Sequence, residues 1–140
     1  MDDPDASPPP PSVSPARILV VDDELSLLKT FPRLLRPHVV ELASSGALAV
    51  ARLATLPAFD VVLCDLHLDD IDGRDLYRQA CARSPELRLR FVFMTGERGT
   101  SPPGLEDDTH AVRVLSKPFD RAALHDALDD TLRRAAGRTA

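Results

Sequence analysis

The sequence of 140 residues has little cysteine and few aromatic side chains. It contains two cysteines, Cys64 and Cys81, no tryptophan, and 4% aromatic residues. Two cysteines cannot form a disulfide framework or supply four thiolates to a structural zinc ion. We therefore expect a reducing compartment, the cytoplasm, and a core built mostly from aliphatic side chains.

The sequence also lacks a long apolar run and an excess of positive charge. No run approaches the roughly 20 apolar residues that a membrane-spanning helix needs, so no membrane association is expected. The N-terminus has neither the basic nor the apolar region of a secretory signal. With 17 basic and 22 acidic side chains the net charge is −5. This balance argues against nucleic-acid binding by the chain itself, because phosphate contacts need a basic face.

Residues 1–15 differ in composition from the rest of the chain. They contain six prolines and three aspartates and almost no apolar side chain. Such a segment cannot offset its own ordering entropy, so it is predicted to be a disordered, proline-rich tail. Residues 16–136 are expected to form one folded domain, and residues 137–140 a short C-terminal tail.

From residue 16 onward, apolar runs of strand length alternate with amphipathic segments of helix length. Continuous apolar character indicates strands that are buried on both faces, as in a parallel sheet. The alternation predicts a doubly wound α/β sandwich with right-handed crossovers. The expected strands are residues 17–22, 38–43, 59–64, 90–95 and 111–115, the second of them being an outer strand. The expected helices are residues 24–36, 46–56, 73–83 and 120–135.

Proline marks the helix-length segments at several points. Pro32 lies inside the first of them and is expected to kink it, and Pro37 helps to end it, because proline donates no backbone hydrogen bond. Residues 97–110 contain two glycines and two prolines. Any helix in that segment is expected to be short, with Ser101 as its N-cap.

Polar side chains stand where the predicted strands end. Asp22 and Asp23 follow the first strand, Asp65 the third, Thr95 the fourth and Lys117 the fifth. In an open parallel sheet, ligands bind outside the carboxyl ends of the strands. Three carboxylates repel one another unless a divalent cation lies among them, and oxygen ligands suit Mg²⁺ or Mn²⁺. A metal, a lysine and a hydroxyl around one carboxylate form a plausible site for making an acyl phosphate.

Four short motifs follow one another along the chain. They are residues 19–24 (LVVDDE), 65–73 (DLHLDDIDG), 94–96 (MTG) and 116–119 (SKPF). In this order and spacing the sequence resembles the receiver domain of two-component response regulators, over almost all of residues 16–135. The resemblance implies a flavodoxin-like fold, a five-stranded parallel sheet in the order 2-1-3-4-5 with helices on both faces.

The resemblance also implies a role for each motif residue. Asp65 would be the phosphoacceptor. Asp23 and Asp65 would bind Mg²⁺ directly, together with the backbone carbonyl of His67, while Asp22 would act mostly through water. Thr95 would be the switch hydroxyl that moves onto the phosphoryl oxygen.

Lys117 would, by the same resemblance, pair with the phosphoacceptor and with the phosphoryl group. The Lys117–Pro118 peptide bond is expected to be cis. No nucleotide-binding glycine motif is present, so nucleotide binding has no support.

The sequence departs from the usual receiver pattern at a few positions. Val114 stands three residues before the motif lysine, where the family usually carries an aromatic ring. Asp69 stands where proline is common, and with Asp70 it adds negative charge near the site. His67 and Glu97 occupy places that modulate the lifetime of the acyl phosphate in related domains.

The implied function is that of a single-domain response regulator in a histidine-to-aspartate phosphorelay. Its partners would be a sensor histidine kinase or a histidine phosphotransfer protein and an unknown downstream protein target. It would accept a phosphoryl group and lose it slowly, which is not the behaviour of a turnover enzyme. Two alternatives stay open: a phosphorylation-independent interaction module that kept the fold, and a receiver excised from a hybrid histidine kinase.

Overall fold

The computed structural model describes residues 15–55, 58–96 and 113–139 of the chain. Within these residues, five parallel strands form one sheet in the order β2-β1-β3-β4-β5. The strands are β1 (Arg17–Val21), β2 (Val39–Ala43), β3 (Val61–Asp65), β4 (Phe91–Thr95) and β5 (Arg113–Ser116). The predicted strand order is confirmed.

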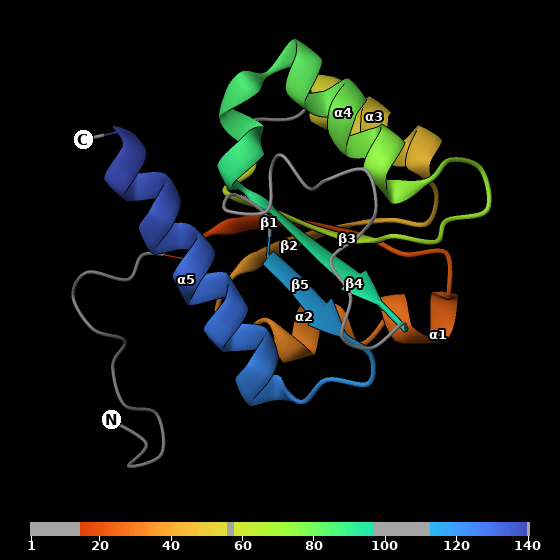
Figure 1. Cartoon of the computed structure of the whole chain (residues 1–140). Helices are drawn as coiled ribbons and strands as arrows, with labels where there is room; N and C mark the ends of the chain where they lie inside the picture. Colours follow the sequence, from red (N-terminus) through yellow and green to blue (C-terminus); the bar gives the residue numbers. More distant parts are fainter. Residues whose placement is uncertain (1–14, 56–57, 97–112, 140) are drawn as a thin grey trace.

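Helices cover both faces of the sheet (Figure 1). One face carries α3 (Gly46–Thr55) and α4 (Gly73–Arg83), followed by the short 3-10 helix η1 (Pro85–Leu89), which the sequence did not predict. The opposite face carries α1 (Leu25–Leu28), α2 (Phe31–Leu34) and α5 (Arg121–Thr139). This is the expected flavodoxin-like, doubly wound α/β sandwich.

Successive residues of a strand belong to opposite layers of the core. In β4, Phe91 and Phe93 join the apolar cluster beneath α3 and α4, whereas Val92 and Met94 join the cluster beneath α1, α2 and α5. Every residue of β3 and β4 is buried. Because both faces of these central strands are covered, their sequences are apolar throughout rather than alternating.

The first helical segment is divided rather than kinked. The expected single helix over residues 24–36 consists of α1 and α2, which Lys29 and Thr30 separate. Pro32 lies in the first turn of α2. A proline fits there because the first backbone N–H groups of a helix have no partner within it. The prediction of one kinked helix was wrong: the chain restarts a new helix at the proline.

The last helix is longer than the sequence indicated. Leu124 and Leu128 are fully buried and Leu132 packs against the same cluster. The helix continues to Thr139, beyond the expected end at residue 135 and into residues assigned to a tail. The proline-rich segment, the segment 97–110 with Ser101, and Glu97 lie outside the described residues. In the part of the chain that is described, no helix is long and apolar enough to cross a bilayer.

Candidate functional site

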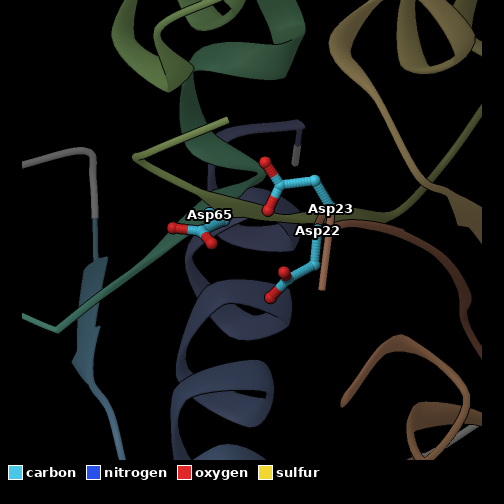
Figure 2. Close-up of side chains that lie close together, drawn as sticks. All are labelled: Asp22, Asp23 and Asp65. Carbon is cyan, nitrogen blue, oxygen red and sulfur yellow. The ribbon is translucent and has the colours of Figure 1, made fainter. Parts of the chain in front are cut away.

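Three carboxylates meet at the carboxyl edge of the sheet (Figure 2). Asp22 and Asp23 directly follow β1, and Asp65 is the last residue of β3, which pairs with β1. Because the strands are parallel, their ends lie at one edge. The three residues each offer a carboxylate oxygen, and these oxygens lie within 4.8 Å of one another. The structure thus brings together the acidic side chains that the sequence placed at strand ends.

Lys117 reaches this cluster from the loop that follows β5. Its Nζ donates to Oδ2 of Asp22 at 3.0 Å and to Oδ2 of Asp65 at 3.1 Å. Its backbone N–H donates to the carbonyl of Thr95 at 2.7 Å, which ties the loop to the end of β4. The Lys117–Pro118 peptide bond is cis, as expected.

The ammonium of Lys117 stays charged in this setting. Burial acts to lower the pKa of Lys117, but hydrogen bonds and charges from Asp22 and Asp65 outweigh it and raise that pKa above its ordinary value. A compact cation therefore stands beside the carboxylate expected to take a phosphoryl group.

Asp22 is the most enclosed of the three carboxylates. Its relative exposure is 0%, and its Oδ1 accepts a hydrogen bond from the backbone N–H of Glu24 at 2.9 Å. Its Oδ2 takes the bond from Lys117. A buried carboxylate is tolerated when both oxygens are paired in this way. The ion pair gives Asp22 a direct role that the sequence did not reveal.

Asp23 and Asp65 are each held by the loop that connects β3 with α4. Oδ2 of Asp23 accepts from the backbone N–H of Asp69 at 2.9 Å, and Oδ1 of Asp65 accepts from that of His67 at 3.0 Å. Burial raises the pKa of Asp23, the charges of Asp69 and Asp65 add to the rise, and the Asp69 N–H opposes it. Negative charge at the site is thus only partly compensated.

This donor set fits a magnesium ion. Carboxylate oxygens are the hard ligands that Mg²⁺ prefers. The single charge of Lys117 offsets only part of the charge on Asp22, Asp23 and Asp65, so a divalent cation would complete the balance. His67, whose carbonyl is the expected fourth ligand, lies in the same loop and forms a β-bridge with Asp72.

The structure also shows contacts that reading the sequence missed. The side chain of Asp72 accepts from the backbone N–H of Arg74 at 2.8 Å and so caps α4. The hydrogen bonds and charge of Arg74 lower the pKa of Asp72 to about 2. A Cβ at Gly73 would lie 2.6 Å from the backbone oxygen of Asp65, so glycine is needed for this close approach. The Asp-Gly pair before a helix was a readable N-cap signal.

The fourth and fifth strands supply the remaining predicted residues. Thr95 ends β4 and is buried, with 2% relative exposure, on the strand next to Asp65. Val114 is partly buried and packs against the cluster beneath α3 and α4. Thr95 therefore lies at the same edge of the sheet as Asp65, and no ring is present at position 114 to change rotamer.

Comparison with known proteins decides the family. The family described as the response regulator receiver domain matches residues 18–129 of this sequence. This chain belongs to the response regulator receiver domain family. Receiver domains of this family are phosphoacceptor signalling modules and not turnover enzymes. The acidic triad of Asp22, Asp23 and Asp65 is typical of the Mg²⁺ site of such domains.

Several curated relatives are regulators from bacteria. Transcriptional regulatory protein GlrR of Escherichia coli K12 is 32% identical over 131 residues, which are 91% of this chain and 29% of that protein. Response regulator receiver protein CpdR of Brucella abortus is 32% identical over 74% of this chain and 85% of its own length. The receiver thus spans less than a third of the longer regulator and most of the shorter one.

Solved structures with the same fold come from distant organisms. A CheY-like receiver domain protein from Methanospirillum hungatei matches with a TM-score of 0.74 at 21% identity, covering 89% of this chain and 99% of the other. The chemotaxis response regulator CheY4 of Vibrio cholerae matches with a TM-score of 0.72 at 24% identity, covering 85% of this chain and 100% of the other. At these identities the likeness supports the fold.

Proposed function

We propose that Asp65 accepts a phosphoryl group from a phosphohistidine on a sensor histidine kinase or a histidine phosphotransfer protein. The reaction depends on Mg²⁺, or on Mn²⁺, which has similar ligand preferences. One observation carries the proposal: the ammonium of Lys117 bridges Asp22 and Asp65 at the edge where three carboxylates meet. The phosphorylated receiver then binds or releases a downstream protein, or relays the phosphoryl group to it.

The transfer is a displacement at phosphorus. A carboxylate oxygen of Asp65 attacks as the bond from phosphorus to the imidazole nitrogen breaks, and the electron pair stays on the imidazole, protonated at its other nitrogen. The product is an acyl phosphate. Asp23, Asp65 and the backbone carbonyl of His67 would hold Mg²⁺ directly, with Asp22 acting mostly through water, and the bound ion would neutralise charge on the phosphoryl oxygens.

Three further side chains act on the product. Lys117 gives up part of its ion pairing with Asp65 and binds a phosphoryl oxygen, since its Nζ already lies 3.1 Å from that carboxylate. The hydroxyl of Thr95 donates to another phosphoryl oxygen. His67, two residues beyond the phosphoacceptor, influences how fast water hydrolyses the acyl phosphate; an unchanged hydrolysis rate after His67→Ala would remove this role.

Phosphorylation by acetyl phosphate, followed by intact mass, tests the proposal. We expect a gain of one phosphoryl mass that requires Mg²⁺ and is absent in Asp65→Asn, which keeps the size of the side chain. Asp75→Asn is the matched control, because Asp75 is an exposed carboxylate of α4 paired with Arg78. Modification that survives Asp65→Asn, or that proceeds equally in EDTA, would contradict the proposal.

A second candidate function is an interaction module that works without phosphorylation. It is favoured by Val114, because the aromatic ring that reports phosphorylation in the family is absent at this position. Beryllofluoride, a stable mimic of the phosphoryl group, separates the two functions. Binding of beryllofluoride with Mg²⁺, observed by fluorine NMR, supports the phosphoacceptor. A folded receiver that binds neither the mimic nor the metal supports the module.

The cellular setting stays a prediction. A cytoplasmic location is expected from the low cysteine content, whereas a histidine kinase or phosphotransfer protein and a downstream protein are expected as partners from the likeness to the family. The boundaries of the domain, residues 16–136, are likewise a prediction that limited proteolysis would check.

A further inference from the structure

The loop between β3 and α4, residues 66–72, is tied to two different parts of the receiver. The backbone N–H of Asp69 donates to Oδ2 of Asp23 at 2.9 Å, which joins the loop to the end of β1. The next residue, Asp70, turns its carboxylate to the start of α3. Its Oδ1 accepts from the N–H of Gly46 at 2.9 Å and its Oδ2 from that of Ala47 at 2.9 Å. Two consecutive residues thus connect a carboxylate of the site with a helix on the sheet.

Helix α3 is a firm anchor for this loop. Ala49 is fully buried, and Val50 and Leu53 pack against the same core cluster. Gly46 is buried beneath the loop, where an added Cβ would overlap the side chain of Ile71. The loop and the start of α3 are therefore in close contact, and a displacement of one is felt by the other.

The start of α3 has a second, local cap. The side-chain oxygen of Ser45 accepts from the backbone N–H of Leu48 at 3.1 Å. The two bonds from Gly46 and Ala47 hold the pKa of Asp70 below its ordinary value, so its carboxylate is charged at neutral pH and suits the positive end of the helix. The Ser45 bond is local to the helix, whereas Asp70 caps the same helix from the loop.

We infer that Asp70 is a positioning residue for the magnesium site: by anchoring the loop on α3, it holds the Asp69 N–H against Asp23 and so fixes the orientation of that carboxylate. The inference rests on the proposed function for the part that concerns the metal. Partners that orient metal-binding carboxylates commonly change metal affinity by 10–100-fold when they are removed.

Two variants separate positioning from helix capping. Asp70→Ala removes the anchor, and Ser45→Ala removes the local cap of the same helix. Mg²⁺ binding is measured by calorimetry on the unphosphorylated full chain. We expect roughly 10-fold weaker binding for Asp70→Ala and less than a twofold change for Ser45→Ala, although both lower the melting temperature. Asp70→Asn keeps one acceptor oxygen and is expected to lie between wild type and Asp70→Ala.

Amide hydrogen exchange, followed by NMR without metal, gives an independent readout. The Asp69 N–H is expected to exchange faster in Asp70→Ala than in wild type, and at the wild-type rate in Ser45→Ala. Equal exchange in all three proteins would overturn the inference, and so would equal Mg²⁺ affinity in wild type and Asp70→Ala. If the wild type binds no Mg²⁺, the proposed function fails, while the exchange rates still decide whether Asp70 anchors the loop.

Discussion

The apolar layers of the sheet and two carboxylates at its polar edge, those of Asp22 and Asp65, are buried alike, but different forces hold the two regions together. In the layers, residues such as Leu63 and Phe93 are fully buried among other apolar side chains. At the edge, Asp22 is equally buried, with 0% exposure, and Asp65 is 7% exposed. Hydrophobic burial stabilises the first region, whereas hydrogen bonds and one ion-paired lysine make the second tolerable.

The difference predicts opposite responses to substitution. A smaller side chain in the layers removes contacts and lowers the free energy of unfolding. At the edge, carboxylates that would share a cation lie close together and repel one another. Neutralising one of them is therefore expected to relieve that repulsion and at the same time to remove the proposed function. The apolar layers and the polar edge are thus expected to differ in how a substitution changes the free energy of unfolding, which four measurements can test.

The largest effect is expected in the apolar layers. Phe93→Ala should lower the free energy of unfolding by about 3–5 kcal/mol, because it empties a fully buried site. The ring of Phe93 lies 5.7 Å, centroid to centroid, from those of both Tyr77 and Phe91. Urea unfolding measures the loss. Leu25→Ala, at a side chain that is 57% exposed, is the control and should change stability by less than about 0.5 kcal/mol.

The next effect concerns the cation of the edge. Lys117→Met leaves the carboxylates of Asp22 and Asp65 without their shared partner and should cost about 2–3 kcal/mol in the free energy of unfolding. Adding Asp22→Asn to this variant should restore part of the loss, since one buried charge then disappears. If the single variant unfolds at the wild-type urea concentration, the ion pairs do not stabilise this edge.

Asp23→Asn tests directly whether neutralising a carboxylate at the edge raises, rather than lowers, the free energy of unfolding. Asp23 is repelled by Asp65 and Asp69, and asparagine keeps an oxygen for the Asp69 N–H. Without metal, the variant should be more stable than wild type by about 0.5 kcal/mol. With Mg²⁺, the melting temperature of the wild type should rise and that of the variant should not. Thermal unfolding with and without the ion gives both results, and a less stable metal-free variant would contradict the comparison.

The smallest expected effect on stability concerns His38, at the opposite end of the sheet. His38 is buried there, and its Nδ1 accepts from the backbone N–H of Ala16 at 2.9 Å. Burial lowers the pKa of His38, as does the charge of His125, whose ring stacks on it at 6.4 Å, while Asp129 and Asp60 oppose the shift.

Because the folded state binds this proton more weakly than the unfolded state, the contribution of His38 to stability is lost as the pH falls below about 6.5. Melting temperatures measured between pH 7.5 and pH 5 should therefore fall more steeply for wild type than for His38→Asn. Parallel pH profiles in the two proteins would show that this histidine does not titrate differently on folding.

Most of the fold, and the charged residues that meet at the site, were predictable from the sequence. The central strands are apolar on both faces, so they read as continuous runs, and α4 begins and ends at the expected Gly73 and Arg83. The sequence also showed which charged residues meet, because parallel strands place their carboxyl ends at one edge. These residues are Asp22, Asp23, Asp65 and Lys117, which follows the fifth strand.

Local reading failed where neighbours decide the outcome. The division of the first helix at Pro32 depends on how two short helices, rather than one kinked helix, seat Leu28 and Phe31 in the core. Helix α5 extends to Thr139, because the sequence has no signal at residue 135 that would stop a helix. Such boundaries depend on packing as much as on propensity.

The sequence by itself determined the alternation of strands and helices, because burial on two faces requires a readable apolar pattern, and it named the polar residues that close the strands. Only the tertiary structure decided which distant groups meet. The ammonium of Lys117 lies beside Asp22, 95 residues away in the chain, and Asp70 caps a helix that begins 24 residues earlier. The physical reason is that hydrogen bonds and ion pairs depend on distances of a few ångströms. Those distances follow from how the layers pack, which no local pattern encodes.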